Sequence, residues 1–279
     1  MDLITLLLLV LTLLGVAMVS GFASGLFGIG GGAIMVPALH YAFKAIGVPD
    51  QAVMHTAVAT SAAVIIVNSW RSVRKHASRG SVDMEILLPN QIWRSYGLWI
   101  GLGSFLAASW IAPKLSGEAL TALFAVIAFF VALQFIFGRP DFTLRESVPG
   151  GIAPPVVGST VGGLSALMGI GGGSLSVPLL SLCNVPIHRA IGTASGFGLA
   201  IALPATAGFI FSGWEVSGRP AFSLGYVNLA GFAIIAGVSL FFVPLGVKSA
   251  HALDGKKLKQ IFGICLMLVA LNMLRESVF

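Results

Sequence analysis

Apolar residues run along this chain in long, nearly unbroken stretches. They occupy eight segments, at about residues 3–27, 52–70, 86–112, 119–137, 152–168, 190–213, 225–247 and 258–274. A helix needs about 20 apolar residues to cross the hydrocarbon core of a bilayer. The pattern therefore predicts an all-α polytopic membrane protein.

Two glycine-rich phrases interrupt this pattern. GIGGGAIMVPAL begins at Gly28 and GIGGGSLSVPLL begins at Gly169, and the two agree at eight of twelve positions. Each glycine weakens a helix by about 1 kcal/mol relative to alanine, so we expect the helix to break at both places. The segments that follow, about 33–43 and 174–183, are too short to cross a core of about 30 Å at about 1.5 Å per residue. The sequence therefore predicts two short helices that begin at the glycine breaks.

The repeat extends beyond the glycines. HTAVATS from His55 matches HRAIGTA from His188, and GEALTALFAVIAFFVALQFI from Gly117 parallels GKKLKQIFGICLMLVALNML from Gly255. Because these landmarks occur in the same order, we predict a duplication. Residues 1–138 form the first transmembrane repeat and residues 139–279 the second, with a linker at about 138–150, all within one integrated membrane domain.

Composition and charge sharpen this picture. Charged residues make up 9% of the chain, against about 25% in soluble domains, which excludes a large soluble domain. The net charge of +6 fits cytoplasmic loops, which collect Lys and Arg, better than a nucleic-acid partner. If each glycine phrase turns the chain back, each half has five elements, and an odd number gives the halves opposite orientations.

This arrangement separates the basic residues strongly, with Arg94 left out because it lies near or within a segment. Eleven fall inside, namely Arg71, Arg74, Lys75, Arg79, Arg139, Arg145, Arg189, Lys248, Lys256, Lys257 and Lys259. Four fall outside, namely Lys44, Lys114, Arg219 and Arg275. Eight simple crossings would give no such bias. We therefore predict two inverted-topology repeats of about five helical elements each, with both termini outside.

Short, glycine-interrupted segments at matching positions of two halves indicate the binding site of a transporter. A helix N-terminus has unpaired N–H groups and about half a positive charge, and glycine lets a ligand approach the backbone. We therefore predict that the two half-helices meet near the midplane and bind an anion. The candidate substrate-binding residues are Gly28, Gly30, Gly31, Gly32, Ala33, His55, Thr60, Ser61, Arg94, Gly169, Gly171, Gly172, Gly173, Ser174, His188, Thr193 and Ser195.

Structural alternatives stay open for these residues. Hydroxyls in apolar segments often bond to their own helix or a neighbour, the histidines can bond to backbone at the interface, and Arg94 can extend its charge to the interface. If Gly31 and Gly172 bind the anion, alanine at either position weakens binding without unfolding the protein. If they only pack, alanine lowers thermal stability instead.

All ten carboxylates lie in loops or at segment ends, which suits an anionic substrate. Any proton coupling would then use His55, His188 or the substrate. Cys183 and Cys265 lie in apolar surroundings, so we expect neither a disulfide nor a metal site. The chain has no H-E-x-x-H and no G-x-S-x-G motif, so we expect no enzyme activity and no cofactor.

At the doubled G-x-G-G-G-x-x-x-V-P-x-L phrase, the chain resembles the TauE/SafE family of membrane proteins, also called the sulfite exporter or four-toluene sulfonate uptake permease family. The A-[VI]-x-T elements at Ala57–Thr60 and Ala190–Thr193 carry the same resemblance, as do the G-x-V-[DN] elements at Gly80–Asp83 and Gly225–Asn228. The resemblance covers essentially the whole chain and implies transport of sulfur-containing anions such as sulfite, sulfonates or sulfoacetate.

We therefore expect a secondary transporter, an exporter of small sulfur-containing anions that works by alternating access, in a bacterial cytoplasmic membrane. An anion channel of the same architecture and a non-transport membrane component of a sulfur pathway are the alternatives. The expected partners are the anion and the lipid bilayer, with no nucleic acid. A coupling proton or sodium ion and a homodimer are left open.

Overall fold

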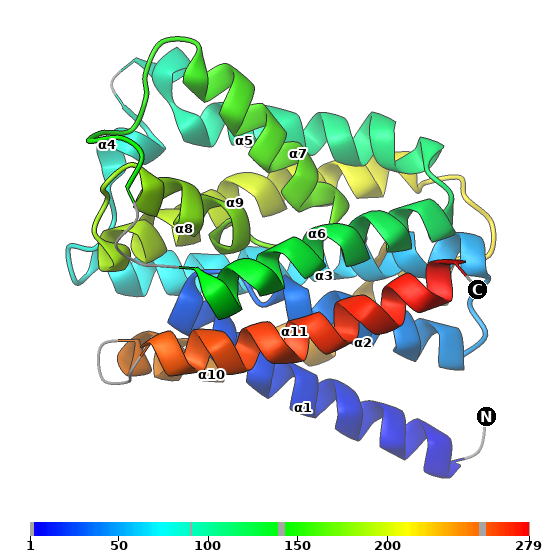
Figure 1. Ribbon diagram of the computed structural model, residues 1–279. Coiled ribbons are helices and arrows are strands. Elements are labelled where there is room, and N and C mark those ends of the chain that lie inside the picture. Colours follow the sequence, from blue (N-terminus) through cyan, green and yellow to red (C-terminus); the bar gives the residue numbers. More distant parts are fainter. Residues whose placement is uncertain (1–2, 90, 139–142, 251–254, 279) are drawn as a thin grey trace.

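The computed structural model describes residues 3–89, 91–138, 143–250 and 255–278, and it is helical almost throughout (Figure 1). The first half contains α1 Leu3–Phe27, α2 Gly32–Ala45, α3 Asp50–Ala77, α4 Met84–Leu87, η1 Ile92–Arg94, α5 Tyr96–Leu106, η2 Ala107–Ile111, η3 Ala112–Lys114 and α6 Gly117–Phe137. The second half contains η4 Pro154–Gly158, α7 Ser159–Leu167, α8 Gly173–Leu182, α9 Ile187–Ser212, β1 Ser223–Leu224, β2 Val227–Asn228, α10 Leu229–Ser249 and α11 Gly255–Val278.

The two glycine phrases break the helices as the sequence predicts. α1 ends at Phe27 and α2 begins at Gly32, while α7 ends at Leu167 and α8 begins at Gly173. The new helices have 14 and 10 residues, so each is too short to cross a bilayer at about 1.5 Å per residue. The prediction of two short helices is confirmed.

The segment predicted as one apolar run at 86–112 is not a continuous helix. α4 ends at Leu87, two residues before Pro89, because proline restricts the residue before it and lacks the N–H that a helix needs. α5 starts again at Tyr96, where the hydroxyl of Ser95 accepts a hydrogen bond from the Leu98 N–H at 3.2 Å. The same hydroxyl donates to the Leu87 carbonyl at 2.6 Å, which ties the two pieces together.

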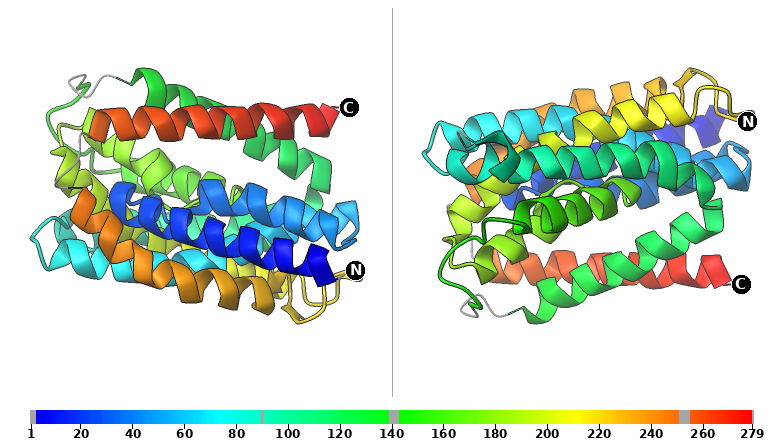
Figure 2. Two further views of the ribbon diagram at one scale, coloured as in Figure 1. Left: turned by 90° about the horizontal axis from the view of Figure 1, so that it is seen from below. Right: turned by 90° about the horizontal axis from the view of Figure 1, so that it is seen from above.

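The helices of the two halves pack against each other reciprocally. α3 and α9 pack together at the centre, α1 packs on α10, and α7 packs on α5. α6 and α11, the last helix of each half, also form a pair. The start of α1 and the end of α11 lie at the same end of the bundle, as Figures 1 and 2 show. Helices from the first and second halves of the chain are thus in contact throughout the bundle.

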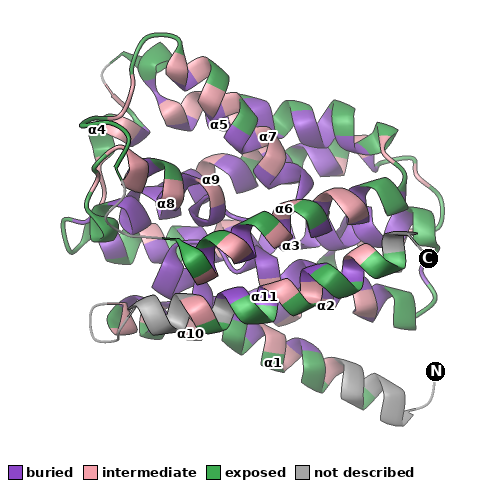
Figure 3. Cartoon of the chain, viewed as in Figure 1, coloured by how far each residue is buried: buried purple, intermediate pink, exposed green. Residues whose placement is uncertain are grey.

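Burial follows this arrangement. α3 is almost entirely enclosed, whereas α6 and α10 leave more than half of their most apolar stretch uncovered (Figure 3). Large apolar side chains on the outer helices are exposed, including Phe130, Phe241 and Leu268. Soluble monomers rarely expose apolar surface on this scale, so these faces contact lipid.

Five of the described helices are long and apolar enough to cross a membrane, namely α1, α3, α6, α9 and α10. The chain is therefore an integral membrane protein with a predominantly helical fold. Besides the helices, the described residues form one short hairpin, in which Ser223 pairs with Asn228 and Leu224 with Val227. This hairpin delivers the chain to the start of α10.

Candidate functional site

The two glycine breaks lie against each other inside the bundle. The N–H of Gly171 donates a hydrogen bond to the carbonyl of Ile29 at 3.1 Å. A Cβ added at Gly32 would collide with the Gly169 carbonyl, and one added at Gly173 would collide with the backbone of Gly28. We call these two contacting segments, residues 28–32 and 169–173, the glycine crossing. Glycine is required here because the two backbones approach more closely than any side chain would allow.

The two segments of the glycine crossing differ in backbone conformation. In the first, Gly28, Gly30 and Gly31 have positive φ angles of 69°, 70° and 83°. In the second, Gly169 has a positive φ of 59°, but Gly172 is right-handed helical with a φ of −55°. The nearly identical phrases therefore fold differently, because each is shaped by a different set of neighbours.

Both short helices begin in the glycine crossing with unused hydrogen-bond donors. Within the described parts of the chain, the N–H groups of Gly32, Ala33, Gly173 and Ser174 have no acceptor. All four residues are buried. Buried backbone N–H groups are nearly always paired, and the start of a helix carries about half a positive charge. The glycine crossing therefore contains two sets of buried donors, one at the start of each short helix, and an oxyanion is an acceptor of the kind that they lack.

Side chains from α3 hold the carbonyl groups of the glycine crossing. The hydroxyl of Ser61 donates to the Gly169 carbonyl at 2.7 Å. The amide of Asn68 donates to the Gly30 carbonyl at 3.3 Å, and the Ser239 hydroxyl donates to the Asn68 carbonyl oxygen at 2.6 Å. These bonds turn the carbonyl groups toward α3.

Ser174 differs from these residues. Its side chain is 3% exposed, and among the described residues its hydroxyl has no hydrogen-bond partner. An unpaired buried hydroxyl is costly and calls for an explanation. A bound anion at the start of α8 would supply the missing partner.

Ser195, another candidate, is already committed to protein contacts. Its hydroxyl donates to the Ile191 carbonyl at 3.0 Å and lies 3.0 Å from the hydroxyl of Ser72. Ser195 thus joins α9 to α3, and its place near the crossing is structural in this conformation.

The two equivalent threonines form a matching pair of contacts. Thr60 accepts a hydrogen bond from the N–H of Asn228 at 2.9 Å, and Thr193 accepts one from the N–H of Asp83 at 2.9 Å. The side chain of Asn228 in turn caps the start of α10, and that of Asp83 caps α4. Each threonine therefore joins its own half to the helix cap of the other half. The repeated G-x-V-[DN] elements end at these capping residues.

The histidines lie near the starts of α3 and α9, away from the breaks. The ring nitrogens of His55 lie 3.0 Å from the Gln51 carbonyl and 2.9 Å from the Ala112 carbonyl, and its ring stacks on Tyr226. His188 is exposed in the first turn of α9. Arg94 is exposed in the short turn before α5.

Asn68 is the residue of this site that sequence reasoning missed. It stands within the apolar run at 52–70, where an amide has to find a partner inside the protein. That signal could have singled it out. Among the described residues, the buried polar side chains are hydroxyls, amides and histidines, and none is a carboxylate. This chemistry suits an anion better than a cation.

Comparison with known proteins identifies relatives of this chain. The family model described as "Sulfite exporter TauE/SafE" matches residues 13–273. A "Probable membrane transporter protein" of Haemophilus influenzae is 30% identical over 269 residues, covering 95% of this chain and 97% of its own. A relative with the same description from Methanocaldococcus jannaschii is 27% identical over 96% of both chains, and YunE of Bacillus subtilis is 24% identical over 97% of this chain and 98% of its own.

No solved structure matches this chain significantly. The family match spans nearly its whole length, and the curated relatives that cover it are described as membrane transporters. The chain therefore belongs to the TauE/SafE family of membrane transporters.

Proposed function

We propose that this protein is a secondary transporter that exports small sulfur-containing anions, such as sulfite, sulfonates or sulfoacetate, by alternating access. The observation that carries the proposal is the glycine crossing, where buried N–H groups at the starts of α2 and α8 lack acceptors among the residues that the structure describes. The description of the family as sulfite exporters supports the substrate class. Sulfite and sulfonate groups each present several oxygens that can accept such hydrogen bonds.

We infer that the halves form an inverted repeat. The ends of α3, α6, α8 and α10 lie at one end of the bundle. The ends of α2, of α9 and of the helical segment that runs from α5 through η3 lie at the other (Figure 1). Ten of the eleven basic residues counted as inside lie in segments near the first group of helix ends, and Arg139 lies outside the described residues. Cytoplasmic loops collect Lys and Arg, so the first end faces the cytoplasm. Both termini then lie on the opposite side.

The packing supports a site that opens and closes. The glycine crossing is tightly packed, since a Cβ at Gly171 would lie 2.5 Å from the Ile29 carbonyl. The anion therefore reaches the donors only when the two segments part. Short helices anchored at a central contact can tilt with their own halves, which is the movement that alternating access requires.

Counterflow in liposomes tests the transport activity. Purified protein is reconstituted into vesicles that are loaded with unlabelled sulfite. Radiolabelled sulfite is added outside at a lower concentration, and its accumulation inside the vesicles is followed. A carrier accumulates label transiently, whereas a channel does not. Competition with sulfonates and carboxylates then defines the substrate class. Imposed proton or sodium gradients identify a coupling ion. Absence of sulfite and sulfonate transport would refute the proposal.

Ser174 tests the site itself. Its hydroxyl has no described partner to lose, so Ser174→Ala should leave thermal stability nearly unchanged and raise the half-saturating sulfite concentration. Ser181→Ala is the matched control, because Ser181 is an equally unpartnered hydroxyl toward the far end of the same helix. If both variants transport sulfite with wild-type affinity, the anion does not bind at the start of α8.

A further inference from the structure

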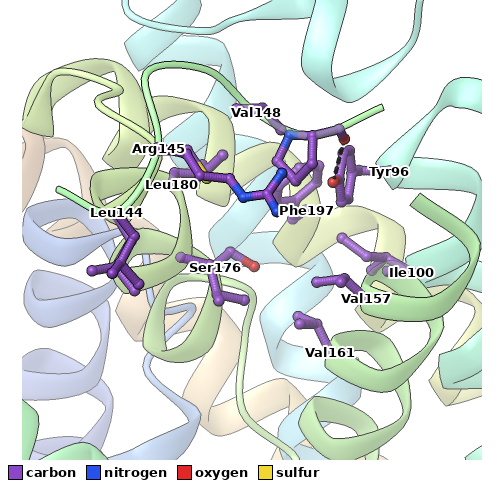
Figure 4. Close-up of a pocket in the computed structure, with 15 residues that line it drawn as sticks. Tyr96, Ile100, Leu144, Arg145, Val148, Val157, Val161, Ser176, Leu180 and Phe197 are labelled. Carbon is purple, nitrogen blue, oxygen red and sulfur yellow. Dashed lines mark hydrogen bonds between the residues drawn. The ribbon is translucent and has the colours of Figure 1, made fainter. Parts of the chain in front are cut away.

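A cavity of about 210 Å³ lies next to the glycine crossing but is lined by none of its residues, at the end of the bundle assigned to the cytoplasm. Its walls come from α5, from α7 with the turn η4 before it, from α8 and α9, and from residues 144–149 of the connection between the halves (Figure 4). The walls are almost wholly apolar, with Val161 and Phe197 among them. A ligand that fills the cavity must therefore present mostly apolar surface.

Two polar side chains interrupt these walls. Arg145 is exposed, and no carboxylate of the described residues pairs with its guanidinium group. Ser176 is 3% exposed, and its hydroxyl has no hydrogen-bond partner among the described residues. In Figure 4 the guanidinium group of Arg145 and the hydroxyl of Ser176 both point toward the middle of the lining side chains. The hydroxyl of Tyr96, by contrast, is occupied as a donor to the Pro149 carbonyl at 2.8 Å.

This combination selects for one chemical class. The guanidinium group of Arg145 is free to pair with an anionic group, and the buried hydroxyl of Ser176 lacks a partner that a ligand in the cavity could supply. The apolar walls call for a hydrocarbon body. The volume exceeds the roughly 150 Å³ of an engineered protein cavity that takes up benzene. An aromatic ring with one small head group therefore fits.

We propose that this cavity binds an organic anion with a compact apolar body, its charged group held by Arg145 and Ser176 and its hydrocarbon part by the surrounding apolar side chains. This site is distinct from the glycine crossing and does not depend on transport. The two are nevertheless neighbours, because the Ser176 N–H donates to the Gly172 carbonyl at 2.9 Å. Phe197 also lines the cavity, and its Cβ would lie 2.9 Å from a Cβ at Gly172. An occupant of the cavity thus sits beside one wall of the crossing.

The native thiol of Cys183 provides a readout of occupancy, because it lines the cavity. The experiment uses a Cys265→Ser background in nanodiscs of phosphatidylcholine, with alkylation of Cys183 followed by mass spectrometry. Benzenesulfonate should slow alkylation in a saturable manner. Benzyl alcohol has a similar ring without the charge and should protect at least tenfold more weakly, as should sulfite, which has the charge without the ring.

Variants of the two polar residues test whether these side chains contact the ligand. Arg145→Gln and Ser176→Ala should each weaken protection by benzenesulfonate about tenfold, the effect of losing one hydrogen bond to a charged group. Arg71→Gln is the matched control, since Arg71 is an exposed arginine near the same end of the bundle and outside the cavity, and protection should stay at the wild-type level. Each protection ratio is measured against the same variant without ligand, which corrects for changes in thiol reactivity.

Any of three results with these probes and variants would overturn the proposal. Benzenesulfonate would fail to protect Cys183, or benzyl alcohol would protect equally well, or Arg145→Gln would match Arg71→Gln. A further arm replaces part of the phosphatidylcholine with phosphatidylglycerol. If the anionic lipid alone protects Cys183 and excludes benzenesulfonate, the occupant is a lipid and the proposal fails. Sulfite counterflow is measured separately, so failure of transport would leave this result unaffected.

Discussion

Alanine at Gly31 should destabilise the protein more than alanine at Gly47, although both glycines have similar positive φ angles of 83° and 78°. A left-handed conformation costs an alanine about 1–2 kcal/mol, and both variants carry this cost. At Gly31 the new Cβ would also lie 2.6 Å from the Ser20 carbonyl oxygen, whereas at Gly47 nothing lies within 4 Å. Overpacking of this kind adds about 1–3 kcal/mol, so the expected loss at Gly31 is about 2–5 kcal/mol.

Two further alanines separate the contributions. Gly172 has an ordinary helical φ, but a Cβ there would lie 2.7 Å from the Ala194 carbonyl, so Gly172→Ala carries the packing cost alone. Gly15 lies within α1 with nothing within 4 Å of a Cβ, so Gly15→Ala carries neither cost and should stabilise by up to about 1 kcal/mol.

Thermal unfolding in detergent, followed by the fluorescence of the five tryptophans, measures these differences. A change of 1 kcal/mol shifts Tm by about 2–4 °C in chains of roughly this size. Gly47→Ala should therefore lower Tm by roughly 2–8 °C, and Gly31→Ala by roughly 4–20 °C. If Gly31→Ala is no more destabilising than Gly47→Ala, the two segments are not held in close contact. The sequence led us to expect that alanine at Gly31 or Gly172 would weaken binding at unchanged stability. Because of the close contacts, we expect alanine at either position to lower stability instead.

Three other outcomes follow from the structure. In a background without native cysteines, Ser78→Cys and Ser249→Cys should resist an impermeant thiol reagent in intact cells, because both residues lie at the end assigned to the cytoplasm. Ser217→Cys should react with the reagent. Labelling of Ser78→Cys or of Ser249→Cys would refute the inverted topology. Thr60→Val should lower Tm more than Thr193→Val. The Asn228 N–H that loses its acceptor in Thr60→Val is buried, and leaving it unpaired costs about 1–3 kcal/mol, whereas Asp83 is partly exposed, so water can replace the hydroxyl of Thr193. Equal losses of Tm in the two variants would contradict this reasoning. Burial raises the pKa of the Cys183 thiol, and the charge of Arg145 lowers it. Because the thiolate is the reactive form, the rise of the alkylation rate of Cys183 with pH should occur at higher pH in Arg145→Gln than in the wild type. An unchanged pH profile would show that Arg145 does not act on this thiol.

Local pattern was sufficient for the membrane class and for the two broken helices. Long apolar runs have to form helices in lipid, where each backbone N–H needs a partner within its own segment. The three consecutive glycines in each phrase break the helix, which is why the starts of α2 and α8 could be placed within a residue or two. The break before α5 was missed because the apolar run at 86–112 is nearly continuous in composition, and Pro89 and Ser95 decide its course.

The sequence by itself thus determined that the chain is a helical membrane protein with two matching glycine breaks. Only the tertiary structure decided what those breaks contact. The Gly171–Ile29 hydrogen bond, the Asn68 amide on the Gly30 carbonyl and the exchange of caps through Thr60 and Thr193 each join residues far apart in the chain. The cavity at Arg145 and Ser176 likewise needs four helices and a connecting segment to enclose it. Hydrophobic pattern and glycine content act within one or two helical turns, whereas these contacts exist only once helices far apart in the chain have packed together.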